Sequence, residues 1–239
     1  MTTDPGGGGA GGALGGVGFA RLAEARLQAH HAIQALTAFA EVLAEPRPKD
    51  LHRSFDWDIG AQGLRTRPAR AAPDLTALFA LPEFELRLER ADVVITTIRA
   101  RGCGAAELRE ALRAATAEAL GTAPPFPAPD FELPEHPTAS GAPFDPGPEA
   151  LAELAGWFTH ADLAILRAVA DLDGAGETRV WPHHFDLATL VELGEGQVGI
   201  GLSPGDGDIP HPYWYVRGYG HDGTDAAELP ELPFGRWKA

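Results

Sequence analysis

The side chains best suited to chemistry lie close together near the C-terminal end of the chain. This stretch carries imidazole, carboxylate and indole groups: His183, His184, Asp186, Asp206, His211 and Trp214. Imidazole and carboxylate groups act as acids and bases, and they are also common metal ligands. The same groups have a structural use, because a histidine can bond to the backbone and an aspartate can cap a turn. We therefore treat the six residues as candidate ligand-binding residues and leave the catalytic residues, the metal and the cofactor unassigned.

A predicted strand limits which of these groups can act together. The apolar run from 185 to 193 is short and bounded by turn residues, which favours a buried strand over a helix. Successive side chains of a strand point to opposite faces, so His184 and Asp186 are expected on one face and His183 on the other. At most one of the two histidines then joins Asp186 directly, unless the chain bends after Pro182.

Two further strands are predicted beyond a glycine turn at residues 194–196. In the first of them apolar and small residues alternate: Val198, Gly199, Ile200, Gly201, Leu202 and Ser203. Its glycines leave one face bare, which suits the close approach of an aromatic ring, another backbone or a ligand. In the second, alternation places Tyr213 and Tyr215 on one face and Trp214 on the other. These aromatic side chains either pack within the sheet or form the wall of a ligand site.

A second group of candidates lies in the first half of the chain, where residues 52–58 are predicted to form a strand. Alternation places His52 and Asp56 on one face of it, which is either solvated or lines a cleft. The dipeptide Phe55-Asp56 has a counterpart in Phe185-Asp186, and each follows a long helix. If the two halves are similar, their strands face one cleft and pool four side chains: His52, Asp56, His184 and Asp186. The alternative is that the dipeptide repeats by chance.

The remaining elements form the framework that would position these groups. Helical periodicity predicts three main helices, at residues 19–44, 105–120 and 149–172. Within the first of them, Gln34 lies one turn beyond His30, so these two side chains can share a face.

The predicted strands, which include a hairpin at residues 84–98, complete the fold. We expect a single α+β domain over residues 18–220, in which a mostly antiparallel sheet is flanked by about three main helices. The glycine-rich residues 1–17 are expected to be a disordered tail, and residues 221–239 a second tail. Nine of the 21 prolines lie in residues 122–148, which predicts an internal linker whose phenylalanines hold it against the protein.

Composition narrows the classes of partner. The net charge of the 239 residues is −15, so the chain repels phosphate backbones and nucleic acid is not expected as a partner. No run of about 18 apolar residues occurs, which argues against a membrane partner. The single cysteine excludes an intrachain disulfide and fits a cytoplasmic protein. A small-molecule ligand and a second copy of the chain are left open as partners.

Three segments resemble a widespread bacterial family known only as a domain of unknown function. They are Trp181-Pro182-His183-His184-Phe185-Asp186-Leu187-Ala188, the turn Gly201–Asp206, and Pro212-Tyr213-Trp214-Tyr215. The order of predicted elements extends the resemblance over most of residues 19–220, but only the last 40 residues carry specific motifs. The chain departs from the family at His184, where a small residue, often serine, is expected. The resemblance implies a fold and no activity, and it puts any shared role of His184 in doubt.

Two classes of function remain after this reasoning. The first is a small-molecule-binding protein or an uncharacterised enzyme, with a polar and aromatic pocket at the end of the C-terminal sheet. The alternative is a non-catalytic scaffold or oligomerisation domain. A functional site would bring His184, Asp186 and the loop of Asp206 into one cleft with unpaired polar atoms. A structural role would leave both carboxylates saturated by backbone N–H groups.

Overall fold

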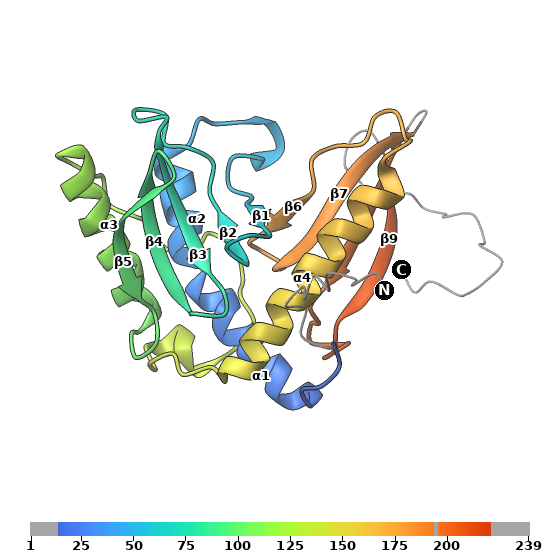
Figure 1. The fold of residues 1–239 in the computed structure, drawn as a ribbon, viewed down its shortest axis with the longest axis horizontal. Helices are drawn as coiled ribbons and strands as arrows, with labels where there is room; N and C mark the ends of the chain where they lie inside the picture. Colours follow the sequence, from blue (N-terminus) through green and yellow to red (C-terminus); the bar gives the residue numbers. More distant parts are fainter. Residues whose placement is uncertain (1–13, 194–195, 221–239) are drawn as a thin grey trace, which may run out of the picture.

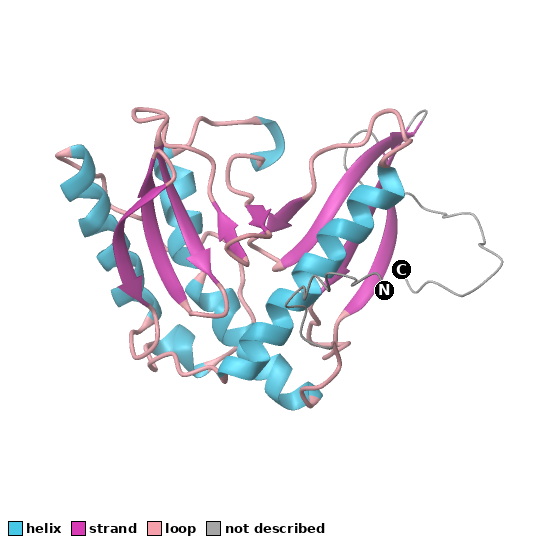
Figure 2. Ribbon diagram, in the orientation of Figure 1, coloured by secondary structure: helices cyan, strands magenta, loops and turns pink. Residues whose placement is uncertain are grey.

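The computed structural model describes residues 14–193 and 196–220, so residues 194–195 of the turn predicted at 194–196, and most of the two predicted tails, lie outside the described chain. The helices are α1 (Phe19–Ala32), α2 (Gln34–Leu43), η1 (Pro48–Asp50), α3 (Ala105–Leu120), η2 (Pro137–Ser140) and α4 (Pro148–Val169). The strands are β1 (Asp56–Asp58), β2 (Gly63–Arg65), β3 (Leu75–Ala80), β4 (Glu85–Arg90), β5 (Val93–Arg99), β6 (Arg179–Trp181), β7 (Asp186–Leu193), β8 (Gly196–Ser203) and β9 (Tyr213–Gly220). Along the chain, α1 and α2 precede strands β1 to β5, and α3 and α4 precede strands β6 to β9 (Figure 2).

The strands form two antiparallel sheets, with the orders β1-β2-β3-β4-β5 and β6-β7-β8-β9. The sheets meet at their first strands (Figure 1). There Phe55 and Val180 exchange two backbone hydrogen bonds, of 2.9 and 2.8 Å. This arrangement confirms the predicted α+β class, although the antiparallel strands divide into two sheets. None of the helices in the described chain is long and apolar enough to span a membrane.

The long helix predicted at the N-terminal end is divided into α1 and α2 by Ile33, which has φ −66° and ψ −11°. Helix α1 packs against α4, and α2 packs against α3 and β3. The other long helix, α4, contacts β7 and β8 of the second sheet. The α1–α2 pair therefore contacts elements of both halves of the molecule, and residues on it can reach the loops that enter either sheet (Figure 1).

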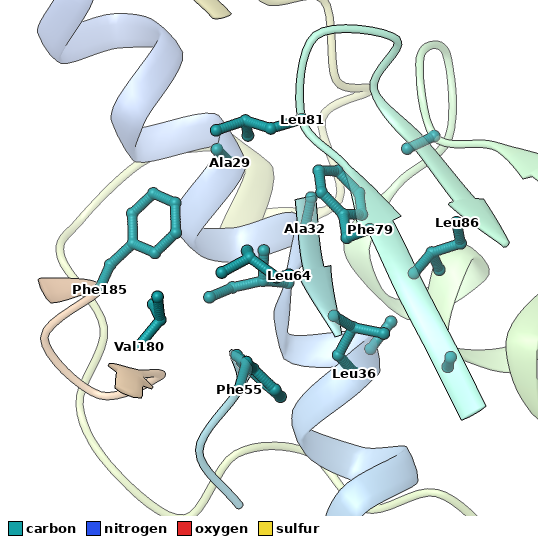
Figure 3. Packing of buried hydrophobic residues seen from close by; sticks show 14 of the residues in the cluster. Ala29, Ala32, Leu36, Phe55, Leu64, Phe79, Leu81, Leu86, Val180 and Phe185 are labelled. Atoms are coloured by element: carbon teal, nitrogen blue, oxygen red, sulfur yellow. The ribbon is translucent and has the colours of Figure 1, made fainter. Parts of the chain in front are cut away.

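The core is continuous across the junction of the sheets. Phe55, Val180 and Phe185 are all fully buried and lie near Ala29 of α1 and Leu64 of β2 (Figure 3). Burying a side chain of this size contributes about 1.5–3 kcal/mol. The apolar residues of both Phe-Asp dipeptides thus serve one core.

Two local predictions were wrong. Residues 51–54 form a turn, and β1 begins only at Asp56. Residues 182–185 also form a turn, and β7 begins at Asp186. Phe185 has φ +57°, a left-handed conformation that ends strand alternation before it. The bend after Pro182 is therefore present, and the rule that separated His183 from His184 does not apply.

The proline-rich linker lies against the protein, as predicted. Phe126 packs edge-on against Phe39, and Phe144 is fully buried against Phe84.

The last residues of the N-terminal tail predicted at 1–17 contact helix α4. The amides of Gly15 and Val17 donate to the carboxylate of Glu153, at 2.9 and 2.7 Å. The last residues of that segment are therefore part of the folded structure.

Candidate functional site

The carbonyl of Pro182 joins the helix pair to the turn before β7. His30 Nε2 lies 2.8 Å from this oxygen, and Gln34 Nε2 donates to it at 3.1 Å. Gln34 Nε2 also donates to the carbonyl of His30 at 2.9 Å. These bonds confirm that His30 and Gln34 share a face, and they use both amide hydrogens of Gln34. The amide oxygen Oε1 of Gln34 takes no part in these bonds and is left as an acceptor.

A cleft of about 130 Å³ lies beside Gln34. One wall is helix α2, and the opposite wall is a short stretch of the proline-rich linker. The lining residues are Gln34, Thr37, Ala38, Glu41, Arg53, Pro127, Ala128, Pro129 and Asp130. The four helical residues follow the spacing of one helix face, which explains why they line one surface. We call this space the α2 cleft.

Two residues that line the α2 cleft each carry a buried polar atom that needs a partner. Gln34 Oε1 and Thr37 Oγ1 have no hydrogen-bond partner among the residues that the structure describes, and each residue is only 3% exposed. A buried polar group without a partner costs about 1–3 kcal/mol. Buried polar groups are nearly always paired, so two such atoms on one cleft indicate an incomplete site.

Arg53 joins the two walls of the α2 cleft. Its Nε lies 3.0 Å from Glu41, and both terminal nitrogens bond to the carboxylate of Asp130. The guanidinium also lies over the ring of Phe131, 5.7 Å from the centroid. The bond to Asp130 raises the pKa of Arg53, and the same bond lowers the pKa of Asp130. Arg53 and Asp130 are therefore both charged at neutral pH.

A second group of polar side chains lies beside the turn at 182–185. We call it the Asp186 cluster, and it consists of His30, Asp186 and Tyr215. The hydroxyl of Tyr215 donates to Asp186 Oδ2, while Oδ1 has no partner outside its own residue within the described chain. Burial raises the pKa of Asp186, and burial together with the Asp186 charge raises the pKa of Tyr215.

The Asp186 cluster is closed by packing. Its members from α1 and β7 are at most 6% exposed, and neither described cleft includes them. Burial lowers the pKa of His30 to about 3, so its imidazole is neutral and stacks on Phe185 at 5.4 Å. The ring of Tyr215 lies over Gly201, where an added Cβ would come within 2.5 Å of it. An aromatic ring therefore covers the bare glycine face, as one of the predicted alternatives has it.

The six C-terminal candidates do not all form one site, although His184 lies within electrostatic range of Asp186. His183 and His184 are exposed, with ring centroids 4.2 Å apart. Burial of part of its ring and the adjacent His184 lower the pKa of His183 to about 4. Asp206 accepts from the amides of Asp208 and Ile209, at 2.8 and 2.7 Å, and from the Tyr213 hydroxyl.

The last two of these candidates lie at the surface. His211 is exposed beside the ring of Phe19, at 5.3 Å, and Trp214 is 42% exposed. The criterion given by the sequence analysis, whether a carboxylate is saturated or has unpaired oxygens, thus separates Asp206 from Asp186. Asp206 is saturated like a structural turn residue, and Asp186 is not.

The pooled site in the two Phe-Asp segments is not formed. His52 Nδ1 accepts from the amide of Arg47 at 3.3 Å, and Asp56 pairs with the buried Arg179. β1 is the end strand of its sheet, whereas β7 is the second strand of the other, so the two dipeptides are not equivalent. Within residues 14–193 and 196–220, no three histidine, cysteine or acidic side chains are placed to hold a metal ion.

A wider depression, of about 310 Å³, lies beyond the C-terminal end of α2. Its lining includes three arginines, one glutamate and two prolines: Arg47, Arg67, Arg70, Glu45, Pro68 and Pro73. Arg67 bonds to the carboxylate of Glu177. We call this space the arginine depression, and its positive lining contrasts with the two carboxylates of the α2 cleft.

Comparisons with protein-family models, curated proteins and solved structures found no match to the chain. The resemblance to a family of unknown function therefore stays a prediction. The function has to be argued from the geometry of the two polar regions.

Proposed function

We propose that the protein binds a small polar molecule in the α2 cleft. The observation that carries the proposal is the pair of buried atoms, Gln34 Oε1 and Thr37 Oγ1, which lack partners in the described chain and belong to two residues that line this space. A ligand that bonds to both atoms would recover the free energy lost by burying them unpaired. Sites of this kind combine a concave shape with a few placed polar groups.

The proposed site differs from the pocket expected from the sequence, which lay at the end of the C-terminal sheet, around Asp186. The α2 cleft is adjacent to that region, because Gln34 bonds to the Pro182 carbonyl in the turn before β7. The residues that the structure places around the cleft include no histidine, cysteine or serine, so we propose binding and assign no reaction.

The second candidate function is self-association, and strand β5 favours it. This strand is the free edge of the first sheet and exposes Val93, Val94 and Ile95, which are 63%, 46% and 44% exposed. Exposed apolar edge strands tend to pair with another strand. Such pairing would make the chain a scaffold or a homo-oligomer without using the cleft.

One experiment separates these functions. The ¹⁵N-labelled protein is titrated with a library of small polar fragments, and the backbone amide shifts are recorded by NMR. We expect a subset of fragments to shift residues 34–41 and 127–131, with dissociation constants on the order of 1 mM. Thr37→Val should weaken binding about tenfold, because it removes one of the two unpaired atoms and keeps the shape of the side chain.

The control is Thr116→Val, which changes a buried threonine of α3 whose hydroxyl donates to the Leu112 carbonyl. It should leave fragment binding unchanged. If no fragment shifts the cleft residues, or if Thr37→Val has no effect on those that do, the binding proposal fails. The rotational correlation time from the same samples reports self-association, and a dimer without cleft binding would favour the second candidate.

A further inference from the structure

The buried side of the α2 cleft carries one obligate acceptor, Gln34 Oε1, and the Thr37 hydroxyl, which can accept or donate. Both hydrogens of Gln34 Nε2 are used by the carbonyls of His30 and Pro182. Turning the amide over would place its oxygen against two carbonyl oxygens, so the network assigns Oε1 as the unpaired atom of this cleft-lining residue. This oxygen can only accept, and a ligand must therefore bring a donor to it.

The walls of the cleft carry a net negative charge. Two carboxylates, Glu41 and Asp130, face a single guanidinium, Arg53, so the lining has a net charge of −1. The nitrogens of Arg53 contact these same carboxylates, and its guanidinium lies over the ring of Phe131. Glu41 and Asp130 are themselves 41% and 69% exposed, so their remaining lone pairs are accessible to a ligand.

From these observations we infer that the ligand of the α2 cleft carries a cationic nitrogen group, of the ammonium or guanidinium class. This inference rests on the proposed function and names the chemistry of its ligand. Such a group supplies several N–H donors to Gln34 Oε1 and Thr37 Oγ1 and balances the charge of the walls. An anionic ligand would instead meet two carboxylates.

The volume sets the size of the group. A cavity of about 150 Å³ accommodates a six-membered carbon ring. The cleft of about 130 Å³ therefore has room for a guanidinium or ammonium head with a short alkyl stem. A longer ligand would extend past Glu41 and Asp130 into solvent.

The test uses three small molecules of similar shape and different charge: methylguanidinium, N-methylurea and acetate. Each is titrated into the full chain while amide shifts are followed by NMR. Methylguanidinium should shift residues 34–41 and 127–131, and N-methylurea should bind there about tenfold more weakly because it offers donors without charge. Acetate should leave the α2 cleft unshifted, and any acetate shifts should fall in the arginine depression.

A matched pair of variants tests the role of the wall charge. Glu41→Gln should weaken methylguanidinium binding about fivefold to tenfold and leave the affinity for N-methylurea nearly unchanged. Glu110→Gln removes the same charge from α3, where Glu110 pairs with Arg113, and should change neither affinity. Thermal melting of both variants checks that they fold like the wild type.

The outcomes distinguish failure of the cationic ligand from failure of the binding site. Equal binding of N-methylurea and methylguanidinium, or acetate binding in the α2 cleft, would overturn the cationic ligand and leave a binding site in place. Methylguanidinium binding that Glu41→Gln does not weaken would also overturn it. If neither this series nor the fragment library shifts the cleft residues, the proposed function itself fails.

Discussion

The Asp186 cluster and the α2 cleft each include one residue that contacts the Pro182 carbonyl, His30 and Gln34 respectively, and the two regions differ in one respect. Each has residues with buried polar atoms that lack a partner in the described chain: Asp186 Oδ1 and His30 Nδ1 in the cluster, and Gln34 Oε1 and Thr37 Oγ1 in the cleft. The two residues of the cleft line a space of about 130 Å³, whereas the cluster is closed by packing.

This difference determines how the free energy cost of burying unpaired polar atoms is reduced in each region. In the closed cluster, burial lowers the pKa of His30 to about 3 and raises the pKa of Asp186, so both groups are biased toward their neutral forms. In the cleft, the atoms belong to an amide and a hydroxyl that cannot change charge. Their missing partner has to come from outside the described part of the chain. The comparison teaches that an unpaired buried atom indicates a ligand only where there is room for one.

The largest expected effect is the loss of stability in Tyr215→Phe. This change removes the donor to Asp186 Oδ2 and leaves a buried carboxyl group with neither oxygen bonded to another residue of the described chain. We expect the free energy of unfolding, measured by urea denaturation, to fall by about 2–3 kcal/mol. Fragment binding in the α2 cleft should be unchanged in the folded variant.

Tyr213→Phe is the matched control. It removes the hydroxyl that bonds to Asp206, but Asp206 keeps its bonds from the amides of Asp208 and Ile209. We expect a loss of about 1 kcal/mol or less. Equal losses in the two variants would contradict the distinction between the two carboxylates.

The next effect is on the pH dependence of stability. Burial raises the pKa of Asp186 above its ordinary value of 3.8, so the folded state holds this proton more tightly than the unfolded chain. Stability from this group is therefore present below pH 3.8 and is lost as the pH rises toward the folded pKa, by up to about 1.4 kcal/mol per pH unit. Asp186→Asn has no such proton and should remove this component.

The free energy of unfolding of the wild type and of Asp186→Asn is measured from pH 4 to pH 7. His30 is present in both proteins and lowers the stability of each as the pH falls from 6.5. Only the difference between the two curves therefore reports the contribution of Asp186. Asp206→Asn is the control: despite burial, the Tyr213 hydroxyl and two amides lower the pKa of Asp206. Its stabilising contribution is lost as the pH falls below 3.8. Parallel curves for wild type and Asp186→Asn would show that Asp186 is not protonated by folding.

Sequence periodicity predicted the elements whose side chains alternate or recur within one segment. Helix 105–120 and the hairpin at 84–98 were predicted almost to the residue, and Tyr213 and Tyr215 share the face that alternation assigns to them. The turn at 182–185 was missed. Phe185 has a positive φ although it is not glycine, because its ring is held between His30 and Phe158 in the core.

The α2 cleft could be predicted only in part. Gln34 was recognised as a neighbour of His30, since the two lie on one helix face. The contacts that complete the cleft join residues far apart in the sequence, such as Arg53 with Asp130 and Gln34 with Pro182, which are 77 and 148 residues apart. The first contact depends on the path of a proline-rich linker and the second on the turn at 182–185, and neither segment has a periodicity from which a contact could be inferred.

The smallest expected effect tests the cleft without any ligand. Thr37→Val replaces an unpaired buried hydroxyl by a methyl group of similar size, so the free energy of unfolding should rise by about 1 kcal/mol. Thr116→Val makes the same change at a fully buried hydroxyl that is bonded to the Leu112 carbonyl, and it should lower stability by about 0.5–1 kcal/mol. Urea denaturation of the two variants measures both changes in the free energy of unfolding, which are expected to have opposite signs. A Thr37→Val variant that is more stable and binds fragments more weakly would show that this hydroxyl is kept for binding at a cost in stability. If instead Thr37→Val loses as much stability as Thr116→Val, the Thr37 hydroxyl already has a partner within the folded protein, and the α2 cleft is no more open to a ligand than the Asp186 cluster.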